Sequence, residues 1–421
     1  MKTAAKDFKM TELGPIPKDW EVKRLGEIWK RFATGPFGSS LHASDYVSGG
    51  TPLVNPMHIV EGKIIPDKEM TVDCVTRKRL VSYQMNAGDL VMGRRGEMGR
   101  VAVVTKKEQG WLCGTGSFTI TLRDNESPDF VARYLRTPQC VAEMTNEAVG
   151  TTIQNLNQTL VSQINIAYPP LPEQRTIAAA LSDVDEMIVA LEKLIEKKRK
   201  IKAGAMQRLL TGKTRLPGFK GAWVEKRLGD CAEVFCDGDW IESADQSDSG
   251  IRLVQTGNVG EGVFLDKSDK KRFVSEATFK RLNCCEIFAG DVLVSRLPDP
   301  AGRACLLPSS SERRITAVDC TIIRFNDLLA AEYFVAFSQA AGYYKQIDEQ
   351  MAGSTRQRIS RKALGDVVVS CPPTLAEQKA IAKVLGDMDE EIAALEAELA
   401  KTRQLKQGMM QELLTGKVRL E

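Results

Sequence analysis

The segment LPEQRTIAAALSDVDEMIVALEKLIEKKRKIKAGAMQRLLTGKTRL occupies residues 171–216 and returns as LAEQKAIAKVLGDMDEEIAALEAELAKTRQLKQGMMQELLTGKVRL at residues 375–420. Glu173 matches Glu377 and Leu216 matches Leu420 at one offset (377 − 173 = 420 − 216 = 204), so nothing has been inserted or lost between these points. A segment that recurs within a chain indicates a duplicated structural unit. The sequence therefore predicts two copies of one unit.

A weaker duplication precedes each of these segments. Residues 20–27 (WEVKRLGE) match residues 223–230 (WVEKRLGD), but the residues between such anchors differ and the offset drifts (223 − 20 = 203, 291 − 89 = 202). Exposed loops tolerate small insertions of this kind. We therefore predict a variable globular domain followed by a nearly constant helix in each half, with parts at residues 1–170, 171–213, 214–373 and 374–421.

Apolar residues in both repeated segments recur at spacings of 4, 3, 4, 3 and 4. This heptad pattern produces one apolar stripe, which a partner helix has to cover. Prolines precede both segments, and Gly212 and Gly416 lie near their ends, where the left-handed C-cap residue of a helix belongs. We predict two helices of about 39 residues, roughly 58 Å long at about 1.5 Å per residue, which pair either antiparallel or parallel. The predicted seam consists of Ile177, Leu181, Val184, Ile188, Leu191 and Ile195, with Ile381, Leu385, Met388, Ile392, Leu395 and Leu399.

The composition narrows the class of protein. Hydrophobic residues make up 43% of the 421 residues, which is enough for packed cores. No apolar run approaches the roughly 18 residues of a membrane span, and the N-terminus has no apolar core of a signal peptide, so we expect a cytoplasmic protein. Ten cysteines with no Cys-x-x-Cys pair, and only two histidines, favour reduced thiols over disulfides or a metal site. A net charge of +3 does not by itself indicate nucleic-acid binding.

Each globular half contains short β-rich runs separated by Gly and Pro, such as residues 117–122 and 321–325. One amphipathic helix is predicted after the last run, near Asp129–Arg136 and Glu332–Ser338. The predicted fold class is therefore α/β: two tandem mixed α/β domains, each followed by a long helix, in an internal pseudo-twofold repeat. The loops combine Arg, Asn, Gln, Ser and Thr, which hydrogen-bond to phosphates and base edges, with glycines that permit close backbone approach.

No catalytic constellation is recognisable. Residues 212–214 (GKT) lack the first glycine of a phosphate-binding loop, because Gln207 stands there, and they close a helix instead of opening one. The prolines after Tyr168 lack the preceding Asn or Asp of a base-methylating motif. We predict neither catalytic nor metal-ligating residues. The lysine-rich run at residues 196–202 is typical of a solvated helix face, with a binding patch as the alternative.

Taken together, these features resemble the specificity subunit of Type I restriction–modification enzymes. The resemblance is carried by PPLPEQRTIA at residues 169–178 and PPTLAEQKAIA at 372–382, each followed by a long helix ending in LLTGK, and by the domain openings at residues 16–26 and 216–229. It implies that each globular half is a target-recognition domain that reads one half of an asymmetric, split DNA site. It also implies that the helices form an antiparallel coiled coil that fixes the separation of the domains.

The resemblance further implies partners. These are double-stranded DNA, two modification subunits with adenine methyltransferase activity and, where present, two restriction subunits. The methyl donor, ATP and Mg²⁺ would then bind to those subunits, and this chain would need no cofactor and catalyse no reaction. Two alternatives stay open: a stand-alone nucleic-acid enzyme, and a scaffold that binds proteins through its coiled coil without reading DNA.

Candidate DNA-binding residues come from the polar loops at corresponding places in the two halves. Arg is suited to guanine, Asn and Gln to adenine, and Ser and Thr mainly to phosphate. The polar character recurs while the identities change, as expected of two similar domains with different ligands, although loops that merely drifted after duplication would look alike. The candidates are Ser39, Asn55, His58, Arg94, Arg95, Thr152, Gln154 and Asn155 in the first half and Gln255, Asn258, Arg296, Thr355, Arg356, Gln357 and Arg358 in the second.

Overall fold

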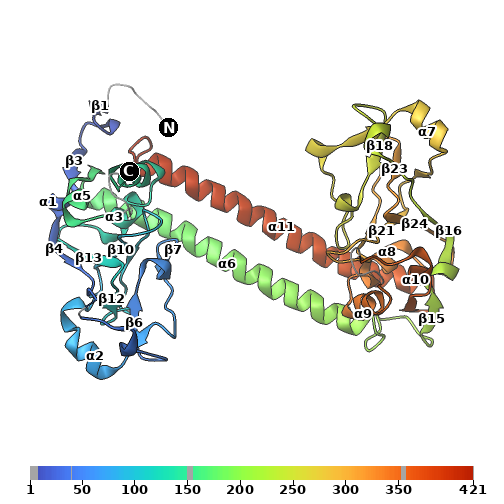
Figure 1. Ribbon diagram of the computed structural model, residues 1–421, viewed down its shortest axis with the longest axis horizontal. Helices are drawn as coiled ribbons and strands as arrows, with labels where there is room; N and C mark the ends of the chain where they lie inside the picture. The colour runs from blue at the N-terminus through green and yellow to red at the C-terminus, as the bar shows by residue number, and fades with distance from the viewer. Residues whose placement is uncertain (1–7, 39, 149–154, 352–356, 421) are drawn as a thin grey trace. The chain divides into compact units, whose positions relative to one another are not determined.

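The computed structural model describes residues 8–38, 40–148, 155–351 and 357–420 (Figure 1). They belong to two compact units. The first unit combines Met1–Leu191 with Glu398–Glu421, and the second unit is Glu192–Ala397. Both boundaries fall inside long helices, α6 (Leu171–Leu209) and α11 (Leu375–Leu413), so each unit contains part of each helix. Both helices have 39 residues, as predicted.

Two four-stranded sheets form the body of the first unit. One is wholly antiparallel in the order β11-β10-β13-β4, and the other has the order β12-β6-β9-β5 with β12 and β6 parallel. The strands are β1 (Phe8–Thr11), β2 (Gly14–Pro17), β3 (Glu21–Arg24), β4 (Trp29–Thr34), β5 (Tyr46–Val47), β6 (Thr51–Val54), β7 (Ile59–Val60), β8 (Lys63–Ile64), β9 (Thr71–Val72), β10 (Leu90–Gly93), β11 (Val101–Val103), β12 (Leu112–Cys113), β13 (Ser117–Leu122) and β14 (Asn165–Tyr168). The helices are α1 (Leu25–Ile28), α2 (Cys74–Arg79), α3 (Pro128–Tyr134), α4 (Pro138–Ala148) and α5 (Gln158–Gln163).

The second unit repeats this plan. Its antiparallel sheet has the order β16-β24-β21-β22, and its other sheet has five strands in the order β17-β19-β18-β23-β20. The strands are β15 (Val224–Arg227), β16 (Ala232–Asp237), β17 (Gln246–Ser247), β18 (Ile251–Val254), β19 (Arg272–Val274), β20 (Glu286–Ile287), β21 (Val292–Ser295), β22 (Ala304–Leu306), β23 (Arg314–Thr316), β24 (Cys320–Phe325) and β25 (Val368–Cys371). The helices are α7 (Glu276–Leu282), α8 (Ala331–Phe337), α9 (Ala341–Glu349) and α10 (Arg361–Gly365).

The predicted strands are present, and the predicted short helices correspond to α3 and α8, but two further short helices follow each of them (α4 and α5, α9 and α10) where only one helix was predicted. Every residue of the central strands β10 and β21 is buried, which explains their continuous apolar sequences. Helix α3 begins where Ser127 accepts a hydrogen bond from the Phe130 amide, with proline in the first turn. The predicted fold class, two mixed α/β domains each followed by a long helix, is therefore correct.

The helices pair antiparallel within each unit. In the first unit Glu173 bonds to Arg419 and Asp185 lies 2.6 Å from Lys406, so residue numbers fall along one segment as they rise along the other. The second unit shows the same direction in the pairs Lys198–Glu391 and Arg215–Glu377. All twelve predicted seam residues are buried or half-buried.

Lysine occupies matching seam positions, Lys202 and Lys406, in the two units. Lys202 lies seven residues beyond Ile195 and pairs with Asp389 at 2.5 Å, while Lys406 lies seven residues beyond Leu399 and pairs with Asp185 at 2.6 Å. The two lysine side chains are 14% and 18% exposed. A lysine at a seam position specifies the register of paired helices at some cost in stability. Part of the lysine-rich run therefore serves helix pairing.

The Glu-Gln pair near the start of each long helix forms corresponding hydrogen bonds in the two units. In the first unit the Glu173 carboxylate accepts bonds from Trp20 Nε1 (2.9 Å) and from the Arg419 guanidinium (2.7 Å). Gln174 accepts a bond from the Ser127 amide and donates one to Pro169 O. In the second unit Glu377 holds Arg215 in the same way, and Gln378 accepts from the Ala330 amide. The end of one helix is thus fixed to the start of the other and to a globular core.

Residues at the end of each long helix also belong to the hydrophobic core of a unit. Leu413 and Leu414 are 3% and 0% exposed and belong to the main core of the first unit, with Trp20 and Phe118. Leu209 and Leu210 occupy the matching core of the second unit. Gly416 and Gly212 have φ of +72° and +69°, which confirms the predicted left-handed caps. Among the described residues, no helix is long and apolar enough to cross a membrane.

Candidate nucleic-acid interface

Strand direction brings the predicted polar loops of the first unit together. Strands β4 and β10 both run antiparallel to β13, so the ends of β4 and β10 and the start of β13 lie at one edge of the sheet. The Gly35 amide donates to Ser117 O (3.0 Å), and the Gly114 amide donates to Val54 O at the end of β6 (3.0 Å). The loops after β4, β6 and β10 and before β13 therefore form one cluster, which we name the first loop cluster.

Glycine is required where these loops touch. A Cβ atom on Gly35 would lie 1.9 Å from Gly114 O, and one on Gly114 would lie 2.3 Å from Asn55 Oδ1. Neither distance is compatible with a side chain, so the close backbone approach explains both glycines. Tight packing of this kind gives the exposed loop residues fixed positions.

Arg94 is a buried residue that contacts several loops of the first loop cluster. Its side chain is 9% exposed, and Nε donates to Asn155 Oδ1 at 3.0 Å. Its backbone amide donates to Gly116 O (2.9 Å), and its guanidinium lies 5.3 Å from the centre of the Phe37 ring. Nη1 is buried with no hydrogen-bond partner among the described residues. Burial, reinforced by the neighbouring charge of Arg95, lowers the pKa of Arg94 from its usual value.

Arg296 has the same position in the second unit. It is 6% exposed, Nη2 donates to Val318 O (2.6 Å), and Nη1 lies 3.5 Å from Asp237 Oδ2. Its carbonyl accepts a bond from the Ile359 amide (3.2 Å), as the Arg94 carbonyl accepts one from the Leu156 amide. Arg296 thus joins the loops after β16, before β24 and before α10, which form the second loop cluster. The burial of both arginines favours a positioning role over direct contact with a base.

Three further candidates form hydrogen bonds inside their own domains. Asn55 Oδ1 accepts a bond from the Gly116 amide (3.3 Å), and His58 Nδ1 lies 3.0 Å from Leu53 O. In the second unit Asn258 Oδ1 accepts from the Gln255 amide (2.9 Å) and Nδ2 donates to Leu265 O (2.9 Å). All three side chains are less than 10% exposed, at 8%, 5% and 9%. They close short turns after β6 and β18.

The other candidates divide into three groups. Arg95, Gln357 and Arg358 are exposed, while Asn155 and Gln255 are half-buried. Arg95 forms a backbone bridge with Asn155, which places both beside Arg94. Ser39, Thr152, Gln154, Thr355 and Arg356 lie outside the described residues. DNA contact by any of the candidates stays a prediction.

The structure adds two aromatic residues that the sequence reasoning missed. Phe37 lies in the loop after β4 and is 54% exposed, and Trp240 lies in the loop after β16 and is 68% exposed. They correspond in the repeat, since 240 − 37 equals the offset of 203 between the two tryptophans that open the domains. An exposed aromatic ring can contact or stack on a base. The available signal was the recurrence of an aromatic residue two positions after Gly35 and Gly238.

A second repeated arginine was also missed. Arg100 Nη1 donates to Pro56 O (3.1 Å) in the first loop cluster. Arg303, the equivalent in the second unit, donates from Nε to Val259 O (2.7 Å) and from Nη2 to Thr256 O (3.1 Å). Both therefore anchor the loop that follows β6 or β18. Among the described residues, no group of three or more His, Cys, Asp or Glu side chains could hold a metal ion.

Comparison with known proteins identifies both halves. The family model described as the Type I restriction modification DNA specificity domain matches residues 17–203 and again residues 220–405. The putative type I restriction enzyme MjaX specificity subunit of Methanocaldococcus jannaschii is 26% identical over 99% of this chain and 97% of its own length. The MjaVIII specificity subunit of the same organism is 24% identical over 96% of this chain and 94% of its own.

Solved structures show the same fold. The S subunit of a Type-I restriction-modification system from M. genitalium superposes with a TM-score of 0.59 at 17% identity, covering 96% of this chain and 97% of that one. The HsdS subunit from Thermoanaerobacter tengcongensis gives a TM-score of 0.50 at 20% identity, covering 97% and 100%. Because the family model accounts for both repeats, the chain belongs to the Type I restriction–modification specificity family, as a specificity subunit with two target-recognition domains.

Proposed function

We propose that each loop cluster reads one half of a split DNA target and that the chain itself catalyses no reaction. The proposal rests on one observation, which is that both units contain the same framework of loop-anchoring arginines but different exposed residues around it. Arg94 and Arg296 join corresponding loops, and Arg100 and Arg303 anchor the next ones, while the exposed residues around them differ between the units. A retained framework with changed exposed residues suits two domains with different ligands.

The chemistry of the exposed residues suits base edges and phosphates. Arg95 and Phe37 in the first unit, and Trp240, Gln357 and Arg358 in the second, combine cations, an amide and aromatic rings on a glycine-supported edge. Arginine forks pair with guanine, amides pair with adenine, and backbone contacts to phosphate fix the orientation. Because the two sets differ, we expect two different half-sites and hence an asymmetric target.

The helices supply the constant part of the proposal. Their antiparallel pairing, with one lysine–aspartate pair in the seam of each unit, supports a spacer of fixed register. We propose that this spacer sets the gap between the half-sites and that two modification subunits dock on the chain. Those subunits would methylate adenine with a bound methyl donor, and restriction subunits, where present, would use ATP and Mg²⁺. The assembly would act on double-stranded DNA in the cytoplasm.

Mapping of methylated adenines tests the proposal. DNA would be sequenced from cells that express the modification subunit with and without this chain. We expect one bipartite, asymmetric motif of fixed gap that is methylated only when the chain is present. Replacing residues 8–170 by the corresponding domain of a relative should change one half of the motif and leave the gap unchanged. Methylation that does not depend on the chain, or equal affinity of the assembled complex for target and scrambled DNA, would refute the proposal.

A further inference from the structure

Two buried arginines lie side by side in the second unit. Arg252 in β18 and Arg314 in β23 are paired in the register of these parallel strands, and each is only 4% exposed. Their guanidinium groups lie 5.6 and 6.0 Å from the centre of the Phe264 ring, so both side chains leave the same face of the sheet. Like charges on neighbouring strands repel each other. The second unit therefore carries a local electrostatic cost at this point.

The fold does not require either arginine. The corresponding strands of the first unit, β6 and β12, pair in the same parallel register. In that register Pro52 and Trp111 occupy the positions of Arg252 and Arg314. Neither residue is charged, yet the same pair of strands forms. Local costs that the fold can do without are expected at functional sites.

The charges around the two arginines do not balance. Arg252 donates a hydrogen bond to Asp266, and its Nη1 lies 3.5 Å from Glu312 Oε2. Lys271 donates to the same Glu312 carboxylate at 2.9 Å. These two carboxylates offset the charges of Arg252 and Lys271, so the positive charge of Arg314 remains.

Arg314 has a neutral hydrogen-bond partner only. Its Nη2 donates to Pro308 O at 2.6 Å, and within the described ranges no carboxylate forms an ion pair with it. Burial, together with the charge of Arg252, lowers the pKa of Arg314 from its usual value. Buried charges are normally paired. This guanidinium is therefore suited to receive an anion from outside the chain.

A cavity of about 370 Å³ opens beside Arg314. The two arginines, Lys271 and both carboxylates line it, together with Phe264 and the exposed serines at residues 309–311. Arginine forks bind phosphate through two parallel hydrogen bonds, and serine hydroxyls donate to phosphate oxygens. The donors that surround this cavity therefore suit a phosphate group.

The cavity lies beside the loop after β18. Phe264 forms a backbone bridge with Val259, and the Leu265 amide donates to Asn258 O (2.8 Å), so the segment that carries Phe264 folds back onto that loop. Arg252 lies two residues before the last residue of β18 (254 − 252 = 2), or roughly 7 Å along the strand. Because a major groove is only about 12 Å wide, backbone phosphates border any base edge that is read within it.

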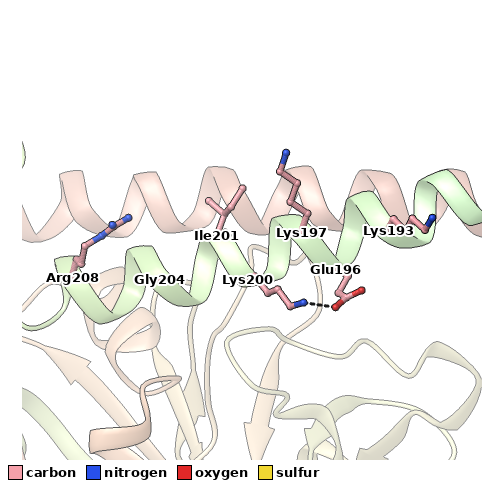
Figure 2. Close-up of a pocket in the computed structure, with 7 residues that line it drawn as sticks. All are labelled: Lys193, Glu196, Lys197, Lys200, Ile201, Gly204 and Arg208. Carbon is pink, nitrogen blue, oxygen red and sulfur yellow. Dashed lines mark hydrogen bonds and ion pairs between the residues drawn. The ribbon is translucent and has the colours of Figure 1, made fainter. Parts of the chain in front are cut away.

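Burial distinguishes this cavity from a second basic hollow, which lies on α6 (Figure 2). There Lys193, Lys197, Lys200 and Arg208 are exposed, and Lys200 donates a hydrogen bond to Glu196. Water solvates exposed cations, and their ion pairs contribute little. The buried guanidinium of the cavity has less water to solvate it, so the observations favour the cavity as the anion site.

We propose that this cavity binds a phosphate group of the DNA backbone beside the second half-site. The inference rests on the proposed function and adds to it a contact that reads no sequence. Arg314 forms the ion pair, while Lys271 and the hydroxyls of residues 309–311 support the other phosphate oxygens. The first unit has Pro52 and Trp111 at the matching positions and lacks this contact. The two half-sites are therefore anchored unequally.

Arg314→Ala in the complex assembled with modification subunits tests the contact. Each phosphate that a protein neutralises adds about 0.9 to the slope of log affinity against log salt, so we expect a slope shallower by about 0.9. Affinity at roughly 50 mM salt should fall at least about tenfold. The loss should be equal for all targets that carry one substituted base pair, because a phosphate contact reads no sequence. Fluorescence anisotropy would measure both quantities.

The matched control for loss of a cation is Lys280→Ala. Lys280 is an exposed residue of α7, whose Phe279 packs against the cluster that contains Ile251 and Ile315. Successive residues of a strand face opposite sides of a sheet, so α7 lies on the side away from Arg314. This variant should leave the slope and the affinity unchanged.

Ser310→Glu keeps the inference testable if Arg314→Ala destabilises the second unit. Ser310 is exposed at the cavity, so the variant should fold, and the added carboxylate should repel a phosphate. Ser310→Gln has nearly the same shape without the charge. We expect the shallower slope from the Glu variant and not from the Gln variant. Thermal unfolding would show that each variant is intact.

Unchanged slopes in both Arg314→Ala and Ser310→Glu would overturn the inference. A loss confined to one base pair would overturn it as well, because Arg314 would then read a base. Inorganic phosphate separates the other source of the same group. If it raises the melting temperature of the unaltered chain and not of the Arg314→Ala chain, while the two bind DNA equally, the cavity serves a free anion. Equal affinity of the unaltered complex for target and scrambled DNA would refute the proposed function, but slopes on scrambled DNA would still test the cavity.

Discussion

Arg94→Ala tests whether a buried arginine positions the recognition loops or reads a base. The substitution removes the bond from Nε to Asn155 Oδ1 and the stacking of the guanidinium on Phe37. A hydrogen bond with a charged partner contributes about 1.5–3 kcal/mol, and an exposed cation–π contact adds about 0.5–1 kcal/mol. The folded arrangement of the loops therefore loses about 2–4 kcal/mol of stabilisation. A loss of that size lowers the affinity for DNA by at most roughly 30- to 700-fold.

The pattern of the loss decides between the two roles. If Arg94 positions the loops, we expect its substitution to weaken binding of the assembled complex at least about tenfold, whichever base pair of that half-site is varied. Recognition of the other half-site should be unaffected. Binding would be measured against a panel of targets that each carry one substituted base pair. If Arg94 instead reads a guanine, discrimination should fall by about 1–3 kcal/mol at one base pair only. A loss confined to one base pair would therefore refute the positioning role.

Arg95→Ala is the matched control for this experiment. Arg95 is the next residue but is exposed, and its backbone bridges to Asn155, which the Arg94 side chain also contacts. It is the better candidate for direct contact with a base. We expect Arg95→Ala to relax one position, or to weaken all targets equally if the contact is to phosphate. Thermal unfolding of the free chain should change little for this variant.

Other predictions concern the aromatic loop, the core and the helix seam. Trp240→Ala should weaken binding to the second half-site by about 1–3 kcal/mol if its ring stacks on a base, with an unchanged melting temperature because the ring is 68% exposed; fluorescence anisotropy would show it, and unchanged affinity would exclude the contact. Leu414→Ala should destabilise the first unit by about 2–5 kcal/mol, since the side chain is 0% exposed in that core; urea unfolding would measure it, and exposed Leu405→Ala should cost little. Burial raises the pKa of Asp185, but hydrogen bonds from Lys406 and Arg133 outweigh it and hold that pKa below its usual value. Asp185 therefore stabilises the folded chain above the unfolded pKa of about 3.9, and this contribution should disappear as pH falls below about 4. Asp185→Asn should flatten the fall of stability measured between about pH 5 and 3, and an unchanged slope would contradict the assignment.

Much of the architecture could be predicted from the sequence because it depends on period and repetition. The heptad spacing predicted the two long helices, and buried strands such as β10 were recognisable as apolar runs. Spacing alone could not choose between antiparallel and parallel pairing. That choice depends on contacts between residues far apart in the chain, such as Asp185 with Lys406.

The candidate site was predicted less completely. A polar residue in a loop can point inward or outward, and sequence does not distinguish the two cases. Arg94 and Asn258 point inward and satisfy backbone groups of their own domains, whereas Arg95 is exposed. The exposed rings of Phe37 and Trp240 were missed because aromatic residues are expected in cores. Only the folded loops show which side chains solvent can reach.

The position of Leu413 and Leu414 in the first core has a consequence for synthesis of the protein. A ribosome releases residues 8–191 long before residues 413 and 414, so the first domain lacks these core residues until more than 200 further residues have been synthesised (413 − 191 = 222). Until then the apolar surface that these leucines cover stays open to aggregation or to chaperones. A chain that stops before residue 413 therefore cannot complete its first recognition domain, although the segment that forms most of that domain is made first.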